Sequence, residues 1–428
     1  MRRTAPILLI FTFYLIVACH NSSDPEIDAT RTARYVTHES AESSPRKSGQ
    51  QHGGGPSQSV SGGTQASGEY DIDGTDRGHR HDSKDGLQEH TEERVLPNLP
   101  ETALKALPAR VQEIPQVTSF QLYQNGEILS EYYRGTMHRN HPVNIKSASK
   151  SVLSALIGIA IREGYIESVD DRAARYLPGY FEALDNPEKK NITIRHLLTM
   201  SSGLESTSFR NYARWVTSSD WVSHVLQGDL EQSPGSHMNY STGDTHLLSA
   251  VLTGATGMSS RRFAVRNLFG PMGITLGGWD RDPAGYYFGG NNMAVSPAGL
   301  LEIGRMYLQG GNYEDRQILP SDWVDTTLTA RFRDVSYNYR NHDYGYLWWR
   351  NDFAGYEVWF AWGYGGQYLF IIPELNAVTV FTGNPDQRAA GGNNGIYKVL
   401  EEDIIPGLFH LEKAGIWPVE KFAKKVAT

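Results

Sequence analysis

The chain contains 428 residues, of which 21% are charged and 11% are aromatic, and its formal net charge at pH 7 is −8. These proportions are typical of a globular protein with a sizeable core, and the length allows one large domain or two ordinary ones. The acidic balance gives no support for nucleic-acid binding, which requires a basic face, and the single cysteine, Cys19, excludes an intramolecular disulfide bond.

The N-terminal residues have the pattern of a secretory signal. Arg2 and Arg3 precede an apolar stretch, 7–18, that is shorter than the ~20 residues that span a bilayer comfortably. The stretch ends in Ile-Val-Ala before Cys19, which resembles the bacterial lipobox. We therefore predict a signal peptide over 1–19, lipidation of Cys19, and export to the bacterial cell envelope, in the periplasm or at the outer membrane. An ordinary signal peptide or a short membrane anchor is the alternative.

Residues 20–94 have the composition of a disordered tether. Glycine, serine and scattered charges dominate the segment, and aliphatic residues are almost absent. Such a composition cannot bury enough apolar surface to offset the entropy that is lost on ordering. We therefore predict one folded domain over residues 95–428.

The folded region is expected to open with a β-hairpin and a buried helix. Two short β-type runs, 120–124 and 127–129, flank Asn125-Gly126, which is a strong hairpin signal. In the next segment, 149–163, apolar positions go most of the way round a helix, and Gly164 follows them. This pattern predicts a buried helix that ends at the glycine.

Helices and then strands are expected along the rest of the chain. The patterns predict further helices over 192–200, 245–252 and 297–308. They also predict strands over 344–350, 357–361, 368–372 and 378–382, with a turn at 373–376 between the last two. The order of a hairpin, a helical middle and a run of strands predicts that the first and last parts share one sheet.

The start of the predicted buried helix carries a chemical motif, Ser147-Ala-Ser-Lys150. Serine becomes a strong nucleophile only when a neighbouring base removes its proton. Positions i and i+3 share a helix face, so Lys150 can reach the Ser147 hydroxyl, and apolar surroundings favour the neutral, basic amine. The motif alone also fits a helix-capping serine followed by a surface lysine, and a second copy at 44–47 lies in the predicted tether.

Several further blocks occur in order along residues 115–400. They are His141-Pro-Val-Asn-Ile-Lys-Ser-Ala-Ser-Lys-Ser-Val-Leu, Ile192-Thr-Ile-Arg-His-Leu-Leu-Thr-Met-Ser-Ser-Gly-Leu, Pro234-Gly-Ser-His-Met-Asn-Tyr-Ser-Thr, Tyr344-Gly-Tyr-Leu-Trp-Trp and Trp362-Gly-Tyr-Gly-Gly-Gln. With these blocks the sequence resembles the β-lactamase-related, class C-like serine hydrolases, nearest to the 6-aminohexanoate-dimer hydrolase and esterase branch. The resemblance implies an α/β (α+β) fold with a mainly antiparallel sheet, flanking helices and an inserted helical subdomain.

The resemblance also implies the roles of individual residues. Ser147 would be the nucleophile, and Tyr240, which matches a Tyr-x-Asn motif, would relay protons with Lys150 as base and then as acid. The backbone N–H groups of Ser147 and Tyr364 would form the oxyanion hole. The substrate would contact Thr242 and three residues of the third motif region, which are Trp362, Gly363 and Gly365.

Two positions depart from the family pattern. Thr242 stands where an asparagine is usual, and Ala361 stands where a lysine or histidine is usual. The second change removes a charge that would bind the carboxylate of a penicillin or a D-alanyl peptide. No Lys, Arg or His occurs between Asn351 and Gln367 to replace it.

The sequence therefore predicts a serine hydrolase that cleaves an ester or a small amide through an acyl-enzyme on Ser147. The alternatives are a non-catalytic binding or sensor domain of the same fold, and a β-lactamase or D-peptidase. The expected partners are a small-molecule substrate and, through the lipid anchor, a membrane. No spacing indicates a metal site, a P-loop or a dinucleotide fingerprint, so no cofactor is expected. We interpret a further group of polar and aromatic residues as structural: His196, Asp244, His246, Trp348 and Trp349.

Overall fold

The structure is a computed structural model, and it describes residues 102–337, 340–387 and 393–413. The predicted signal peptide, Cys19 and the predicted tether lie outside the described residues. Within them, none of the helices is long and apolar enough to cross a membrane.

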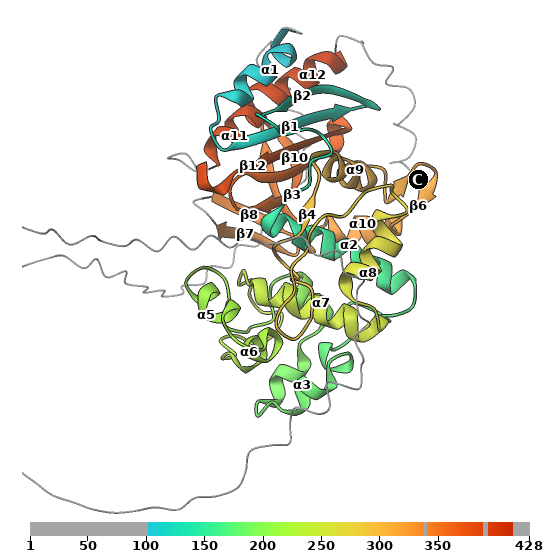
Figure 1. The fold of residues 1–428 in the computed structure, drawn as a ribbon, viewed down its shortest axis with the longest axis vertical. Coiled ribbons are helices and arrows are strands. Elements are labelled where there is room, and N and C mark those ends of the chain that lie inside the picture. Colours follow the sequence, from blue (N-terminus) through green and yellow to red (C-terminus); the bar gives the residue numbers. More distant parts are fainter. Residues whose placement is uncertain (1–101, 338–339, 388–392, 414–428) are drawn as a thin grey trace, which may run out of the picture. The chain divides into compact units, whose positions relative to one another are not determined.

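An eight-stranded antiparallel sheet, in the order β2-β1-β12-β11-β10-β9-β8-β7, is the centre of the fold (Figure 1). The N-terminal strands therefore pair with the C-terminal ones, as the element order predicts. The β1–β2 hairpin turns at Asn125 and Gly126, which both have positive φ, as the hairpin signal requires. The strands of this sheet are β1 (Val117–Gln124), β2 (Glu127–Tyr133), β7 (Phe332–Tyr337), β8 (Arg340–Tyr344), β9 (Trp349–Phe353), β10 (Tyr356–Gly363), β11 (Gln367–Ile372) and β12 (Ala377–Gly383).

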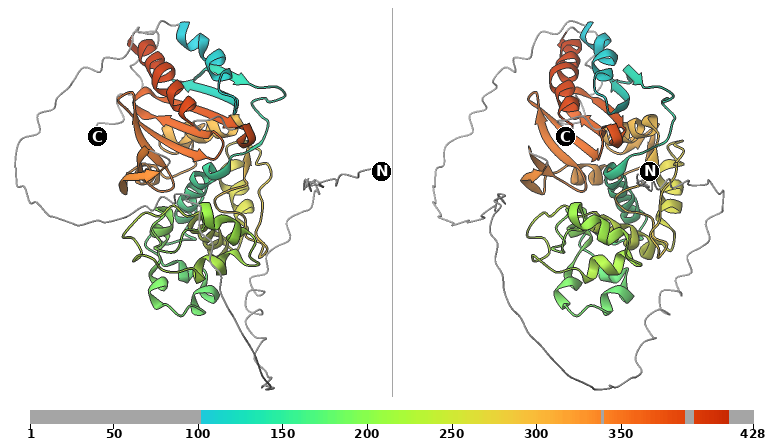
Figure 2. Two further views of the ribbon diagram at one scale, coloured as in Figure 1. Left: turned by 90° about the vertical axis from the view of Figure 1, so that its left-hand side faces the viewer. Right: turned by 60° about the vertical axis from the view of Figure 1, so that its left-hand side comes forward.

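Helices cover both faces of the central strands. Leu369 of β11 meets α9 at Gly304, whereas its neighbours Tyr368 and Phe370 contact Tyr397 of α11. Successive side chains of a strand point to opposite faces, so α9 and α11 lie on opposite sides of the sheet. Figure 2 shows α1 and α12 beside each other near the β1–β2 end. These helices are α1 (Thr102–Gln112), α9 (Pro297–Leu308), α11 (Asn394–Val399) and α12 (Ile405–Lys413).

The middle of the chain forms the helical subdomain, which lies below the sheet in Figure 1. Its helices are α3 (Pro178–Glu182), α4 (Ile194–Leu198), α5 (Tyr212–Val216), α6 (Trp221–Gln227), α7 (Thr242–Thr256) and α8 (Ser260–Ala264). Helix α10 (Ser321–Thr327) and two short strand pairs lie outside the eight-stranded sheet. The pairs are β3 (Val143–Asn144) with β4 (Ala294–Val295), and β5 (Asn312–Tyr313) with β6 (Arg316–Gln317).

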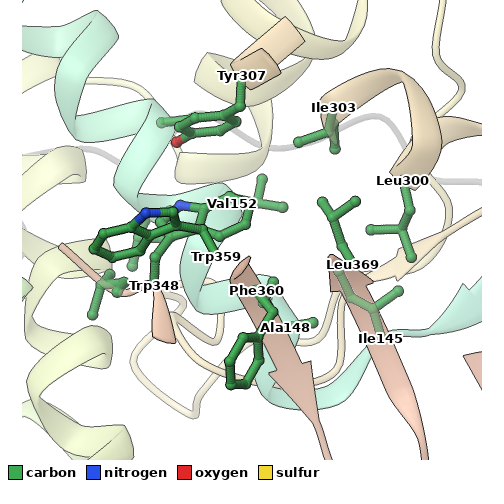
Figure 3. Packing of buried hydrophobic residues seen from close by; sticks show 14 of the residues in the cluster. Ile145, Ala148, Val152, Leu300, Ile303, Tyr307, Trp348, Trp359, Phe360 and Leu369 are labelled. Carbon is green, nitrogen blue, oxygen red and sulfur yellow. The ribbon is translucent and has the colours of Figure 1, made fainter. Parts of the chain in front are cut away.

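Helix α2 (Ser149–Arg162) joins the two layers. Its first twelve residues are all buried, as the apolar pattern predicts, and it packs against both α7 and β10. Figure 3 shows Val152 of this helix close to Tyr307 and Trp348, whose rings lie 4.8 Å apart. The helix that follows Ser147 is therefore buried between the sheet and the helical subdomain. The predicted fold class, an antiparallel sheet with flanking helices and an inserted helical subdomain, is confirmed.

One predicted strand is wrong in its middle. The run 344–350 is divided by a turn, because Leu347 adopts a positive φ of 63°. Its backbone N–H donates to the carbonyl of Leu198, and its carbonyl accepts from the hydroxyl of Ser151 on α2. Strand β8 therefore ends before this turn and β9 begins after it.

Candidate active site

Ser147 lies in a single turn of 3-10 helix, Lys146–Ala148, directly before α2. The preceding residue, Lys146, has a φ of +52°, and its N–H donates to Oδ1 of Asn144 at 2.9 Å. The N–H of Ile145 donates to the carbonyl of Met293 at 2.9 Å. These bonds hold a left-handed backbone conformation that a lysine rarely adopts, and they fix the turn that presents the serine.

Lys150 is hydrogen-bonded to the serine. Its Nζ donates to Oγ of Ser147 at 3.0 Å and to the carbonyl of Gly290 at 2.7 Å. The side chain is buried, with 2% of its surface exposed, and no carboxylate among the described residues pairs with it. Burial alone lowers the pKa of Lys150 to about 7, so a large fraction of the amine is neutral at neutral pH.

The acceptor for Lys150 comes from a glycine pair that the sequence analysis does not identify. A side chain at Gly290 would place its Cβ 2.8 Å from Nζ of Lys150, and one at Gly289 would collide with the carbonyl of Thr245 on α7. Only glycine allows this close approach of backbone to helix. Two adjacent glycines before two asparagines are the sequence signal that could have indicated it.

Tyr240 lies beside the Ser147–Lys150 pair. Nζ of Lys150 is 5.1 Å from the centre of the Tyr240 ring, and the ring stacks on Trp349 with centroids 5.7 Å apart. Burial raises the pKa of Tyr240 to about 12, and a hydrogen bond between its hydroxyl and that of Ser147 acts in the opposite direction. The phenol therefore carries its proton at neutral pH.

A short polar segment, Ser206 to Ser208, holds the Tyr240 loop in place. The hydroxyl of Ser206 donates to the carbonyl of Tyr240 at 2.7 Å. Oγ of Ser208 accepts from the N–H of Thr242 at 2.9 Å and lies 3.0 Å from its hydroxyl. Thr242, predicted to contact substrate, therefore has its hydroxyl engaged with Ser208 at the first turn of α7.

The third motif region lies where β10 ends, against the serine turn. A Cβ at Gly363 would collide with the carbonyl of Ile145, so the glycine allows the strand to approach that turn. Ala361 is buried in the core, and Trp362 stacks on Tyr368 with centroids 5.9 Å apart. Tyr364 follows in the turn that leads to β11.

These segments enclose one cavity of about 720 Å³. Of the residues predicted from the sequence, Ser147, Tyr240, Thr242, Trp362, Tyr364 and Gly365 line it. The other lining residues are Ser208, Phe209, Tyr212, Asn291, Ser336, Tyr337, Trp349 and Asn393. Of the lining residues that the structure describes, half are aromatic, and none is an Asp, Glu, Lys, Arg or His. Lys150 lies behind Ser147, and Gly363 lies beside the lining residue Trp362.

His246 and Asp282 form a buried structural contact near the site. Nε2 of His246 lies 2.9 Å from Oδ2 of Asp282, with both side chains fully buried. The N–H of Gly289 donates weakly to Nδ1 of the same histidine at 3.5 Å. His246 thus ties the segment that carries Gly290 to helix α7, which agrees with its structural interpretation.

The remaining polar residues near the site also have local partners. His196 caps α4, because its Nδ1 accepts from the N–H of Thr193 at 3.3 Å. Asp244 accepts from the hydroxyl of Ser202 at 2.8 Å, and burial raises the pKa of its carboxyl to about 7. In the part of the chain that the structure describes, no group of three His, Cys, Asp or Glu side chains could hold a metal ion.

An antiparallel sheet with helices on both faces, and a Ser-x-x-Lys turn that opens a buried helix, define the fold class of β-lactamases and DD-peptidases. A sequence model of the family described as Beta-lactamase matches residues 111–402, and the chain belongs to this family. The resemblance inferred from the sequence blocks is confirmed.

Individual relatives are distant. The 6-aminohexanoate-dimer hydrolase of Paenarthrobacter ureafaciens is 22% identical over 323 residues, which are 67% of this chain and 79% of that protein. A D-stereospecific amidohydrolase from Streptomyces sp. superposes with a TM-score of 0.55 at 18% identity, covering 70% of this chain and 98% of that chain. EstCE1, a hydrolase with promiscuous acyltransferase activity, has a TM-score of 0.56 at 16% identity, covering 72% of this chain and 97% of that chain. The structural likeness shows a shared fold.

Proposed function

We propose that this protein is a serine hydrolase that cleaves an uncharged ester or small amide through an acyl-enzyme on Ser147. The observation that carries the proposal is the 3.0 Å hydrogen bond between Nζ of Lys150 and Oγ of Ser147. The lysine is buried without a carboxylate partner, so it can act as a neutral base. A helix-capping serine with a surface lysine would leave the lysine exposed.

Acylation follows from the positions of the three side chains. The neutral amine of Lys150 takes the proton of Ser147, and Oγ forms a bond to the substrate carbonyl carbon. The backbone N–H groups of Ser147 and Tyr364 are assigned to the oxyanion that develops on the carbonyl oxygen. As the bond to the leaving group breaks, the phenol of Tyr240 protonates that group and regains a proton from the Lys150 ammonium.

Deacylation uses the same base on a water molecule. Lys150, again neutral, removes a proton from a water molecule that attacks the acyl carbon. The bond from the carbon to Oγ of Ser147 then breaks, and the Lys150 ammonium gives its proton to Oγ, which restores the serine hydroxyl and the neutral amine. The product is the free carboxylic acid of the acyl group.

The lining of the cavity supports an uncharged substrate. A carboxylate that entered would lose its hydration, and no Lys, Arg or His among the described lining residues would pair with it. The buried Ala361 stands where relatives of this type have a cation. We therefore expect inefficient turnover of penicillins and D-alanyl peptides. The names of the dimer hydrolase and the amidohydrolase among the relatives add small amides to the candidate substrates.

We further propose that the protein acts at the bacterial cell envelope. The lipobox-like residues before Cys19 support a lipid anchor, and the composition of residues 20–94 supports a flexible tether between anchor and domain. Radiolabelled palmitate incorporation that Cys19→Ser abolishes would support this location, and unchanged incorporation would contradict it.

The test of the proposed reaction is hydrolysis of p-nitrophenyl acetate and butyrate by the purified protein and its Ser147→Ala variant. Repeated turnover by the wild type and none by the variant is the expected result. Equal rates in both proteins would show that Ser147 is not the nucleophile. A single burst without turnover would favour the alternative of a sensor domain that keeps its acyl label.

A further inference from the structure

Two aromatic side chains at the cavity are unusually exposed. Phe209 exposes 67% of its surface and Tyr364 exposes 56%, and both line the cavity that contains Ser147. They are the most exposed large hydrophobic residues in the described part of the chain. Apolar surface that gathers at a cavity is characteristic of a binding site.

The exposed position of Phe209 is imposed by its surroundings. The residue has a φ of +53°, which is costly for any residue other than glycine. On its N-terminal side, Ser208 is bonded to Thr242 of α7, and on its C-terminal side the amide of Asn211 donates to the carbonyl of Ser206 at 2.9 Å. The fold thus holds the ring at the cavity although burial elsewhere would stabilise it more.

Tyr337, at the end of edge strand β7, contacts Phe209 and other aromatic residues of the cavity. Its ring centre lies 5.8 Å from that of Phe209, 5.0 Å from that of Trp362 and 4.8 Å from that of Trp349. The contact with Phe209 joins the sheet and the helical subdomain across the cavity. The aromatic surface is therefore continuous from one side to the other.

The polar groups around this surface are neutral. The amides of Asn291 and Asn393 and the hydroxyls of Ser208 and Ser336 are the polar side chains of the lining besides those of Ser147, Thr242 and the tyrosines. An uncharged ring would stack on the aromatic walls without losing the hydration of a charge. A charged substrate would find no opposite charge among the lining residues in 102–337, 340–387 and 393–413.

We propose that Phe209, Tyr337, Trp362 and Tyr364 form a subsite for a flat, uncharged ring of the substrate, beside the nucleophile. The inference rests on the proposed function and names its substrate class, an ester or amide with an aromatic group in its acyl or its alcohol part. Ring stacking on two walls contributes about tenfold to the specificity constant over an aliphatic chain of similar size.

The test compares matched esters with the full-length protein. Ethyl phenylacetate against ethyl hexanoate examines the acyl part, and benzyl acetate against hexyl acetate examines the alcohol part. We expect kcat/KM to favour the aromatic ester about tenfold in one of the two pairs. Equal kcat/KM in both pairs would overturn the proposal. So would a preference for a benzyl ester that carries a trimethylammonium group on its ring, since that would assign the walls to a cation.

Substitutions in the subsite test whether it causes the preference for aromatic esters. Phe209→Ala and Tyr337→Leu should reduce the ratio of the kcat/KM for the aromatic ester to that for the aliphatic ester. If Phe209→Ala disturbs folding, Phe209→Leu keeps most of the apolar volume and tests the loss of the ring alone. Tyr165→Ala, which removes an exposed tyrosine outside the cavity lining, should leave the ratio unchanged. An unchanged ratio in the Phe209 and Tyr337 variants would remove these residues from the subsite.

A binding measurement separates this inference from the catalytic one. In the Ser147→Ala protein, benzyl acetate should quench tryptophan fluorescence because Trp349 and Trp362 line the cavity. The additional Tyr337→Leu change should weaken that binding. If Ser147→Ala hydrolyses esters like the wild type, the proposed nucleophile is wrong, while quenching still decides whether the ring subsite exists.

Discussion

Lys150 and the His246–Asp282 pair are two buried ionisable groups on either side of the Gly289–Gly290 segment. His246 lies 2.9 Å from a carboxylate, and both side chains are fully buried. Lys150 is buried to a similar degree, but its hydrogen bonds go to a serine hydroxyl and a backbone carbonyl.

The difference separates a structural group from a reactive one. A buried charge with a partner is stable in place, and removing the partner leaves an uncompensated charge that costs about 3–5 kcal/mol. A buried cation without a partner lowers its pKa and becomes neutral instead. Lys150, whose pKa is lowered to about 7, is therefore suited to proton transfer.

The sharpest test of this comparison is Lys150→Met. We expect kcat/KM to fall about 10³-fold or more, because the base for Ser147 is lost. The free energy of unfolding should stay equal or rise, because no unpaired cation remains to be buried. Steady-state kinetics and urea unfolding measure the two effects. A loss of activity below tenfold would contradict the assignment of Lys150 as the base.

Substitution in the His246–Asp282 pair should reduce stability more than activity, the reverse of what we expect for Lys150→Met. His246→Ala leaves Oδ2 of Asp282 buried without a partner, while Oδ1 still accepts from the N–H of Tyr286. We expect the free energy of unfolding to fall by about 3 kcal/mol. Activity should fall far less than in Lys150→Met. The exposed His237, replaced by alanine, is the matched control and should change the unfolding free energy by less than about 0.5 kcal/mol. If His246→Ala unfolds like that control, the pair does not stabilise the fold.

The pH dependence of activity and of stability tests the lowered pKa of Lys150 directly. The kcat/KM value should rise as pH increases through about 7, because Lys150 must be neutral to act as base. Its folded-state pKa lies below its unfolded value of 10.5, so the unfolded chain binds more protons between these pH values. Relative to Lys150→Met, the wild type should therefore gain stability with rising pH, by up to about 1.4 kcal/mol per unit. A flat difference between the two proteins would show that Lys150 is not desolvated.

The smallest expected effect concerns Asp244, a buried carboxyl with one partner. Ser202 donates to Oδ1, whereas Oδ2 has no hydrogen-bond partner among the described residues. Burial raises its folded-state pKa from 3.8 to about 7, so the unfolded chain releases the proton first and stability falls as pH rises between these values. Asp244→Asn should lack this fall, and between pH 5 and pH 8 it should gain about 2–3 kcal/mol of stability relative to the wild type. Thermal unfolding at both pH values measures the change, and a constant difference would argue against the raised pKa.

Much of the fold could be predicted because its signals are local. Asn125-Gly126 marks its hairpin by turn chemistry, and the apolar positions of 149–163 mark the buried helix. The predicted helix 297–308 agrees with α9 in both ends. Strand β7 was not predicted, because Phe332–Tyr337 mixes charged and polar residues at a sheet edge. The turn at Leu347 was missed because its conformation depends on bonds to α2 and α4, which are distant in the sequence.

The candidate site also has one part that could be predicted from the sequence and one part that could not. The spacing of Ser147 and Lys150 on one helix is readable from the sequence, and the family blocks indicate Tyr240. Gly290 and the aromatic residues Phe209 and Tyr337 come from segments whose role depends on contacts across the cavity. Long-range contacts of this kind leave no periodicity or motif in a single sequence.

The proposed aromatic subsite and the proposed nucleophile belong to separate stretches of chain. Phe209 lies in the turn before α5, Tyr337 ends an edge strand, and Tyr364 lies in the turn after β10, whereas Ser147 opens the buried helix α2. Replacement of a rim segment would change which compounds enter without moving the buried serine and lysine. We therefore expect the surface loops of this chain to tolerate changes that alter its substrate range without altering the packing of α2.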